Sequence, residues 1–162
     1  MTLRVVIMGV AGCGKSALGA GVAAEMGIPY REGDDLHPAA NVARMAAGIP
    51  LTDDDRWPWL DRVAEVLRRE APVVVSCSAL RRAYRDRLRD HAGGPVCFVH
   101  LSGSRALIAE RMAARKGHFM PLTLLDSQFA ALEPPGQDEA LTVDIDRPLR
   151  RLVALVVREL VQ

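Results

Sequence analysis

The chain has 162 residues, of which 49% are hydrophobic and 25% charged, the composition of one globular domain with enough apolar side chains for a core. The 21 lysines and arginines against 20 aspartates and glutamates leave a net charge of +1, so the basic excess typical of a nucleic-acid-binding protein is missing. Three cysteines without a C-x-x-C pair argue against a disulfide framework and a thiolate zinc site, and no apolar run approaches the ~20 residues that cross a bilayer, so we expect a cytoplasmic protein with no membrane partner.

Short apolar runs alternate with helical patterns along the whole chain, which predicts a single α/β domain over residues 1–162 with a parallel sheet and crossover helices. The expected strands, in chain order, are residues 3–8, 28–31, 73–77, 96–101 and 141–145. The expected helices are residues 15–26, 38–47, 58–70, 79–91, 104–116, 122–132 and 148–161. Gly27 and Gly48 stand where C-terminal caps belong, and Pro58 and Pro148 suit a first helical turn.

The first expected strand runs into a full match to G-x-x-x-x-G-K-[ST], which leads directly into the first expected helix. Backbone N–H groups of such a loop point at phosphate oxygens, and the helix N-terminus adds positive potential. The lysine reaches the β- and γ-phosphates, and the hydroxyl ligates Mg²⁺. The sequence therefore predicts a nucleoside-triphosphate site made by eight consecutive residues: Gly9, Val10, Ala11, Gly12, Cys13, Gly14, Lys15 and Ser16.

Missing patterns narrow the class of nucleotide-binding protein. A GTPase would carry N-K-x-D for guanine, which is absent, and the one D-x-x-G, at residues 90–93, falls at a polar helix end. A motor ATPase would hold Mg²⁺ with an acidic residue at the end of the third strand, where this chain has Ser76-Cys77-Ser78. The chain is also too short for the domain of a transporter ATPase. Phosphoryl transfer to a small molecule is the leading class.

Acidic residues follow the second expected strand. A carboxylate at this strand exit can face the γ-phosphate, where it accepts a proton from the acceptor hydroxyl or positions the metal shell. Asp34 is the candidate, and the alternative is that Asp34 and Asp35 cap the next helix. His37 is a candidate contact to the acceptor, with a capping or packing role as its alternative.

Two arginines in the next segment are candidates for binding a carboxylate in bidentate fashion. These are Arg44 and Arg56, whose alternative is a solvated surface role. The three aspartates at 53–55 are also what a favourable first helical turn requires. Trp57 and Trp59 are interpreted as packing anchors, because an aromatic side chain buries a large area at a helix junction.

The exit of the third strand supplies further candidates, because ligands of parallel α/β sheets bind outside the carboxyl ends of the strands. Ser78, Arg81 and Arg85 are the candidate substrate contacts there. Cys77 has no base at a motif-like spacing and is interpreted as a packing residue.

Arg111 and Arg115 are four residues apart and lie on one face of the expected helix 104–116. The irregular stretch that follows, residues 116–121, suits a lid that closes over the nucleotide, with the two cations neutralising charge that develops during transfer. A plain amphipathic helix is the alternative. The segment from 34 to 70, with two helices between strands, is the natural place for an insertion that caps the substrate.

Together these motifs resemble the thermoresistant-type gluconate kinases, a branch of the small P-loop kinases. The segments that carry the resemblance, in family order over residues 4–149, are MGVAGCGKS, GDDLHP, NVARMAAGIPLTDDDRWPWL, CSALRRAYRD, RKGHFMPLTLLDSQFAALEPP and VDIDRPL. Any one of them can arise by chance, whereas six in order are highly specific. Departures are mild: arginine stands at 44, 81 and 82 where some relatives have lysine, which keeps the charge and changes the hydrogen-bond geometry.

The resemblance implies a three-layer P-loop fold like that of the nucleoside monophosphate kinases, with a lid and a five-stranded parallel sheet in the order 2-3-1-4-5. It implies ATP- and Mg²⁺-dependent phosphorylation of D-gluconate to 6-phosphogluconate in the cytoplasm, feeding the pentose phosphate or Entner–Doudoroff routes, often by a homodimer. In the matching segments Lys15 and Ser16 hold phosphates and metal, Asp34 stands near the acceptor hydroxyl, and Arg111 and Arg115 belong to the lid. The lid segment adds His118 and Gln128 as candidate acceptor contacts.

Two alternative functions stay open at this point. One is a kinase for another small polar acceptor, such as shikimate or another sugar acid. The other is a nucleotide-binding regulator that hydrolyses ATP slowly or not at all. The first differs in its acceptor, and the second would show no ADP formation that an acceptor stimulates.

Overall fold

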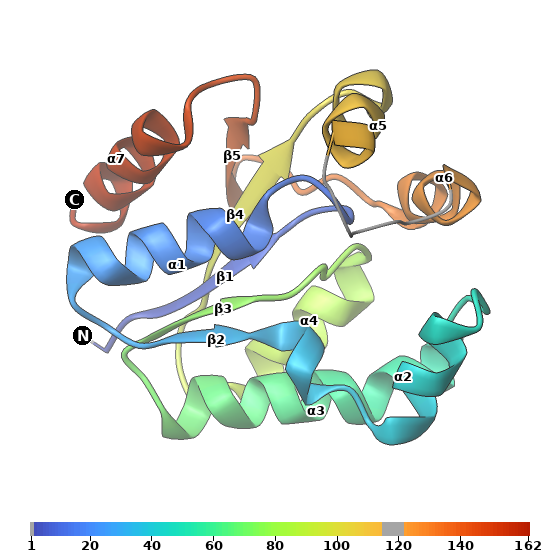
Figure 1. Ribbon diagram of the computed structural model, residues 1–162. Helices are drawn as coiled ribbons and strands as arrows, with labels where there is room; N and C mark the ends of the chain where they lie inside the picture. Colours follow the sequence, from blue (N-terminus) through green and yellow to red (C-terminus); the bar gives the residue numbers. More distant parts are fainter. Residues whose placement is uncertain (1, 115–121) are drawn as a thin grey trace.

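The computed structural model describes residues 2–114 and 122–162 and shows one five-stranded parallel sheet between two layers of helices (Figure 1). The strands are β1 (Arg4–Met8), β2 (Tyr30–Glu32), β3 (Val73–Ser76), β4 (Cys97–Ser102) and β5 (Ala140–Asp144). The helices are α1 (Lys15–Met26), α2 (Ala39–Ala46), α3 (Asp53–Arg69), α4 (Arg82–His91), α5 (Arg105–Ala114), α6 (Leu122–Ala131) and α7 (Leu149–Leu160), with a 3₁₀ turn, η1 (Gly33–Leu36). The strand order is β2-β3-β1-β4-β5, so the expected fold and topology are confirmed.

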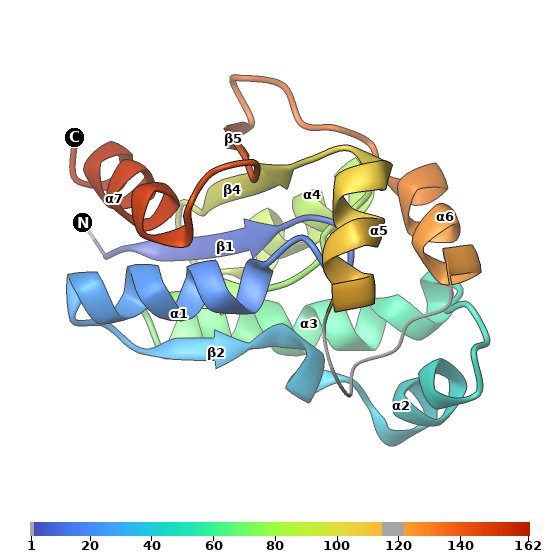
Figure 2. The same ribbon diagram turned by 45° about the horizontal axis from the view of Figure 1, so that its top comes forward.

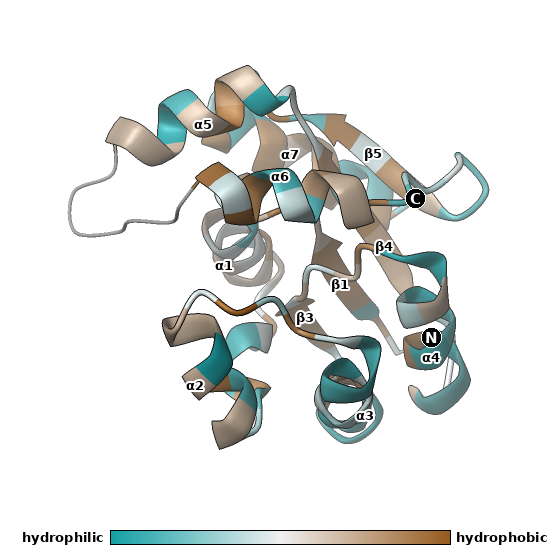
Figure 3. Cartoon of the chain, turned by 90° about the vertical axis from the view of Figure 1, so that its right-hand side faces the viewer, coloured by the Kyte–Doolittle hydropathy of each residue, from teal (hydrophilic) through white to brown (hydrophobic). Residues whose placement is uncertain are grey.

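The sheet separates two apolar clusters, because successive side chains of a strand point to opposite faces. Val5 and Ile7 of β1 pack toward α1 and α7, in a cluster that also includes Leu18 and Val156. The alternating partners Val6 and Met8 pack on the other face, toward α3 and α4. Figure 2 shows α1 and α7 on one face of the sheet with α3 and α4 behind it, and Figure 3 shows apolar strands between helices that carry polar residues. Burial on both faces explains why β1 is apolar after Arg4 and β3 is apolar before Ser76.

Two helices, α3 and α4, begin three or more residues away from the expected start. Helix α3 begins at Asp53, five residues before Pro58, because Thr52 accepts a hydrogen bond from the Asp55 N–H and the Asp55 side chain accepts one from the Thr52 N–H. This capping box defines the start, and Pro58 lies inside the helix. Helix α4 begins at Arg82, because Ala79 has a left-handed φ of 46° that no helix interior adopts.

The ends of the strands decide where the site lies. Helices α2, α5 and α6 gather beyond the carboxyl ends of the strands, and both termini lie at the opposite end of the sheet (Figure 1). In the part of the chain that the structure describes, no helix has both the length and the apolar composition of a membrane span.

Candidate active site

The loop between β1 and α1 forms the floor of a pocket of about 900 Å³ at this end of the sheet. Gly14 adopts φ +98° and precedes α1 as its N-terminal cap residue, a conformation that side-chain-bearing residues rarely adopt. Residues 11–16 of the predicted phosphate loop line the pocket. Gly9 and Val10 do not line it, and their carbonyl oxygens each accept a hydrogen bond of 3.0 Å from the Lys15 ammonium. The loop therefore holds its lysine beside the pocket.

Glu32, the last residue of β2, is a pocket residue that sequence reasoning passed over. It accepts hydrogen bonds from the hydroxyls of Ser16, Ser76 and Tyr30, the last at 2.8 Å. Burial raises the pKa of Glu32, but these hydrogen bonds outweigh burial and hold it below the ordinary value. Its position at a strand end directly before Gly-Asp was the signal available in the sequence. The ionised carboxylate orients the hydroxyl of Ser16.

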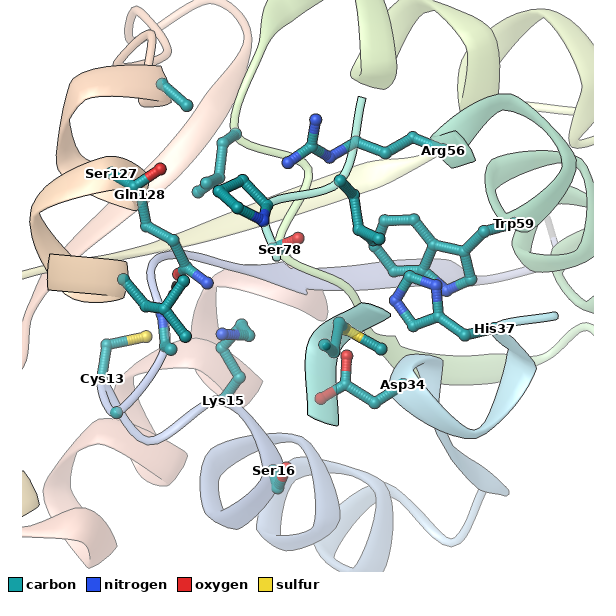
Figure 4. Close-up of a pocket in the computed structure, with 18 of the residues that line it drawn as sticks. Cys13, Lys15, Ser16, Asp34, His37, Arg56, Trp59, Ser78, Ser127 and Gln128 are labelled. Atoms are coloured by element: carbon teal, nitrogen blue, oxygen red, sulfur yellow. Dashed lines mark hydrogen bonds between the residues drawn. The ribbon is translucent and has the colours of Figure 1, made fainter. Parts of the chain in front are cut away.

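Gly33 brings the next carboxylate into the pocket. A Cβ atom at Gly33 would lie 2.0 Å from the backbone oxygen of Ser76, so only glycine allows η1 to approach β3 this closely. Asp34 then lines the pocket opposite Lys15 (Figure 4). Loss of hydration raises the pKa of Asp34, the Lys15 charge lowers it, and the charge of Glu32 raises it, with a net upward shift. A carboxylate that keeps some affinity for a proton is suited to general base catalysis.

His37 packs inside the protein and also lines the pocket. Its ring stacks on Trp59 with 4.1 Å between ring centroids, and its Nδ1 lies 3.1 Å from the side-chain nitrogen of Asn41. Burial first and then the charge of Arg56 lower the pKa of His37 to about 4, so the imidazole is neutral at pH 7. The Trp59 indole donates to the Gly33 oxygen at 2.8 Å, which confirms its anchoring role.

Arg56 enters the same side of the pocket from α3. Its guanidinium end points toward the middle of the pocket (Figure 4). Its Nη1 donates to the hydroxyl of Tyr84 at 3.2 Å, and the same nitrogen lies 3.7 Å from the Asp53 carboxylate. Tyr84, which lines the pocket as well, was not among the candidates from the sequence.

Other predicted residues divide between the pocket and the surface. Ser78, Arg111 and Gln128 line the pocket. Gln128 accepts a hydrogen bond of 2.6 Å from the Ala11 N–H, which ties α6 to the phosphate loop, and Arg111 donates to the Ile145 oxygen at 2.7 Å. Arg44 and Arg81 are exposed and lie outside the pocket lining, with Arg44 3.8 Å from the Asp55 carboxylate. The predicted roles of Arg115 and His118 fall on residues outside the described ranges.

The prediction that Arg85 contacts the substrate is wrong. Its side chain is 1% exposed and donates to the backbone oxygens of Ala79, Leu80 and Glu133. Two further hydrogen bonds, of 3.1 and 3.0 Å, join it to the carboxylate of Glu139. The guanidinium therefore connects the β3–α4 loop to the segment before β5, with its donors used inside the protein.

The structure confirms that Cys77 is a packing residue. It is buried at the end of β3, and burial raises the pKa of its thiol to about 12. A thiol with this pKa stays protonated at neutral pH and is a poor nucleophile.

The pocket has two chemically different sides. On one side, backbone N–H groups at a helix N-terminus, the Lys15 ammonium and the oriented Ser16 hydroxyl suit a nucleotide phosphate chain. On the other, Asp34, neutral His37, Ser78 and Arg56 suit a small polar acceptor that carries negative charge. Asp34, on the second side, lies between Lys15 and His37 (Figure 4).

Comparison with known proteins gives consistent results. Residues 5–135 match a family model described as an AAA domain. The thermoresistant gluconokinase of Escherichia coli K12 is 44% identical over 159 residues, 94% of this chain and 90% of that protein. The gluconokinase of Gluconobacter oxydans 621H is 48% identical over 138 residues, 83% of this chain and 77% of that protein. The crystal structure of a gluconokinase from Sinorhizobium meliloti 1021 is 50% identical with a TM-score of 0.92, and the match covers 98% of this chain and 91% of that one.

Proposed function

This chain belongs to the gluconokinase family of P-loop kinases, and on that premise we propose that it transfers the γ-phosphoryl group of ATP to the terminal hydroxyl of D-gluconate, giving 6-phospho-D-gluconate. The observation that carries the proposal is the two-sided pocket, in which a phosphate loop faces a subsite with one carboxylate, one neutral imidazole and one guanidinium. Pocket and relatives point to the same reaction.

The phosphate-loop side would hold ATP and Mg²⁺. The Ser16 hydroxyl donates a hydrogen bond to Glu32, which leaves the lone pairs of the Ser16 oxygen available for a cation. Mg²⁺ usually takes one or two protein ligands and completes its shell with phosphate oxygens and waters. Ser16, with its hydroxyl oriented by Glu32, is the proposed protein ligand. Bound Mg²⁺ would neutralise charge on the phosphates.

Lys15 has the central role on this side. Its hydrogen bonds to the oxygens of Gly9 and Val10 hold the ammonium at the loop, from which it would move to the β- and γ-phosphate oxygens. Arg111 lines the pocket from α5 and would stabilise the same charge. Arg115 and His118 remain predictions for the lid.

Asp34 would orient the terminal hydroxyl of gluconate and accept its proton as the phosphoryl group arrives. The raised pKa of Asp34 strengthens it as a base, and the Lys15 charge limits that rise. His37 is neutral and suits a sugar hydroxyl, and Ser78 and Gln128 offer further polar contacts.

Arg56 would bind the carboxylate of gluconate. The cationic side chains that line the pocket, among the described residues, are Lys15, Arg111 and Arg56. Lys15 belongs to the phosphate loop, and Arg111 is bonded to the chain after β5, whereas Arg56 lies on the acceptor side. Its planar guanidinium matches a carboxylate in bidentate geometry.

Acceptor-dependent ADP release tests the proposal. The purified protein is incubated with Mg-ATP and, in turn, gluconate, other sugar acids, shikimate and nucleoside monophosphates. We expect selective stimulation by gluconate with phosphogluconate as product, and loss of that stimulation in Lys15→Ala, which should keep its fold by circular dichroism. Stimulation by a different acceptor would overturn the specificity, and no stimulation in a folded protein that binds ATP would favour a regulator.

We also propose a cytoplasmic setting and a homodimer. Cys13, Cys77 and Cys97 are all unpaired in the structure, which suits a reducing compartment. The dimer rests on the resemblance to the family, and sedimentation equilibrium of the purified chain would give the mass of either one or two copies.

A further inference from the structure

We propose that Tyr84 is a positioning residue that fixes the Arg56 guanidinium for a carboxylate-bearing acceptor, and so helps the enzyme to select a sugar acid over its neutral analogues. The inference rests on the proposed function and adds a residue to the acceptor side that sequence reasoning did not assign. It starts from a contact between α3 and α4 at the edge of the pocket.

Tyr84 is held rigidly in the first turn of α4. Its side chain belongs to the apolar cluster between the sheet and the outer helices, the residue is 2% exposed, and the edge of its ring meets the ring of Trp57 at a centroid distance of 5.7 Å. The hydroxyl reaches the pocket wall, where it accepts the hydrogen bond from Arg56 Nη1 and donates its proton to Asp53. The single donor of the phenol is therefore committed to Asp53.

The arrangement restrains Arg56 in two ways. Tyr84 accepts one N–H of the guanidinium at 3.2 Å, and the guanidinium carbon lies 5.4 Å from the centroid of the Tyr84 ring. Among the described residues, the Arg56 guanidinium makes one hydrogen bond, the one to Tyr84. Its other N–H donors therefore remain for the pocket, toward which the group points (Figure 4). An arginine that is already oriented loses less side-chain entropy when it binds a carboxylate.

Arg56 and Asp53 form an ion pair, but Tyr84 occupies the Asp53 carboxylate and so leaves the guanidinium donors of Arg56 for the pocket. The Asp53 carboxylate accepts the proton of Tyr84 and lies 3.7 Å from the guanidinium, beyond hydrogen-bond distance, so the two do not form the bidentate pair that a free aspartate and arginine favour. Asp53 orients the phenol, and the phenol orients the guanidinium. The cation is left with donors for a substrate carboxylate.

Tyr84→Phe tests the inference, because it keeps the ring and its packing and removes the hydroxyl. We expect the dissociation constant and the KM for gluconate to rise about tenfold, the size of one lost hydrogen bond to a charged group, with kcat and the KM for ATP within about twofold. The inhibition constant of D-gluconamide, which replaces the carboxylate with a neutral amide, should stay at the wild-type value. Preference for the acid over the amide then falls about tenfold.

Tyr30→Phe is the matched control. It removes the other tyrosine hydroxyl of the chain, which bonds to Glu32 and Ser76 on the phosphate side. It should change the dependence on Mg-ATP and keep the preference for acid over amide. An equal loss of affinity for acid and amide in Tyr84→Phe, or no change in either, would overturn the inference, because a merely structural tyrosine does not distinguish charge.

Asp53 gives a second, independent pair of variants. Asp53→Asn keeps an acceptor for the Tyr84 proton and should retain the preference, whereas Asp53→Ala removes the acceptor and should lower it. Equal preferences in the two variants would contradict the proposed chain of contacts. Failure of the proposed function is distinguishable, because it would appear as absence of gluconate binding and turnover in the wild-type protein.

Discussion

Replacement of Arg85 by methionine should destabilise the protein without weakening gluconate binding. Methionine has a similar reach and no charge, so it leaves Glu139 without its principal partner and three backbone oxygens without their donor. Removing one partner of a buried ion pair costs about 3 to 5 kcal/mol. Arg89 still contacts Glu139 at 2.7 Å and compensates in part, so the expected loss is about 3 kcal/mol.

Urea unfolding measures this loss. With a slope of about 2 kcal/mol per molar urea, typical for a domain of this size, the unfolding midpoint should fall by about 1.5 M. The double variant Arg85→Met, Glu139→Gln removes the stranded charge and should recover about 1 kcal/mol of the stability. In the absence of urea, and at a temperature where both proteins are folded, the KM of Arg85→Met for gluconate should match that of the wild type.

The opposite pattern would refute the reasoning. An unchanged midpoint with a KM for gluconate raised tenfold or more would mean that Arg85 serves the substrate, as its position after the third strand suggested. Equal stability in the single and double variants would show that Glu139 is not the group left without a partner.

Two further predictions concern acid stability and chemistry. Burial raises the pKa of Glu139, but hydrogen bonds from Arg85 and Arg89 outweigh it and lower the pKa to about 2 from an ordinary 4.5, so its stabilisation is complete above about pH 5 and is lost as the pH falls toward 2. The urea midpoint of Glu139→Gln should accordingly depend less on pH in this range, and parallel acid limbs would contradict it. Asp34→Asn should lower kcat by about 100-fold with the KM for ATP within about twofold, measured by coupled ADP release, and an unchanged kcat would remove Asp34 from the chemistry.

The nucleotide side of the pocket could be predicted because its information is local. The loop needs glycines at set positions, a lysine and a hydroxyl, and a strand and a helix on either side, all within about two dozen residues. The structure places Gly14 in the left-handed conformation and begins α1 at Lys15, as expected. Strand order is less local, and it came from the family resemblance.

The start of α3 and the separate roles of Glu32 and Asp34 could not be predicted from local sequence preference alone. Pro58 is acceptable in a first turn, but the capping box at Thr52 starts α3 earlier, and the helix then includes the proline. Glu32 and Asp34 are both acidic and two residues apart, so the sequence does not assign their roles. Three hydroxyls from α1, β2 and β3 converge on Glu32, a consequence of strand pairing that only the fold reveals.

Tyr84 and Arg85 show why the acceptor side could not be assigned from residue type. They are consecutive in α4, and consecutive helical residues point about 100° apart. Arg85 has the charge that a substrate carboxylate requires, but Glu139, 54 residues away, already pairs with it. Tyr84 has no charge, yet it contacts the guanidinium of Arg56. A cation can bind a substrate only through donors that the fold leaves unpaired. Among the described arginines that line the pocket, Arg56 lies on the acceptor side and keeps such donors.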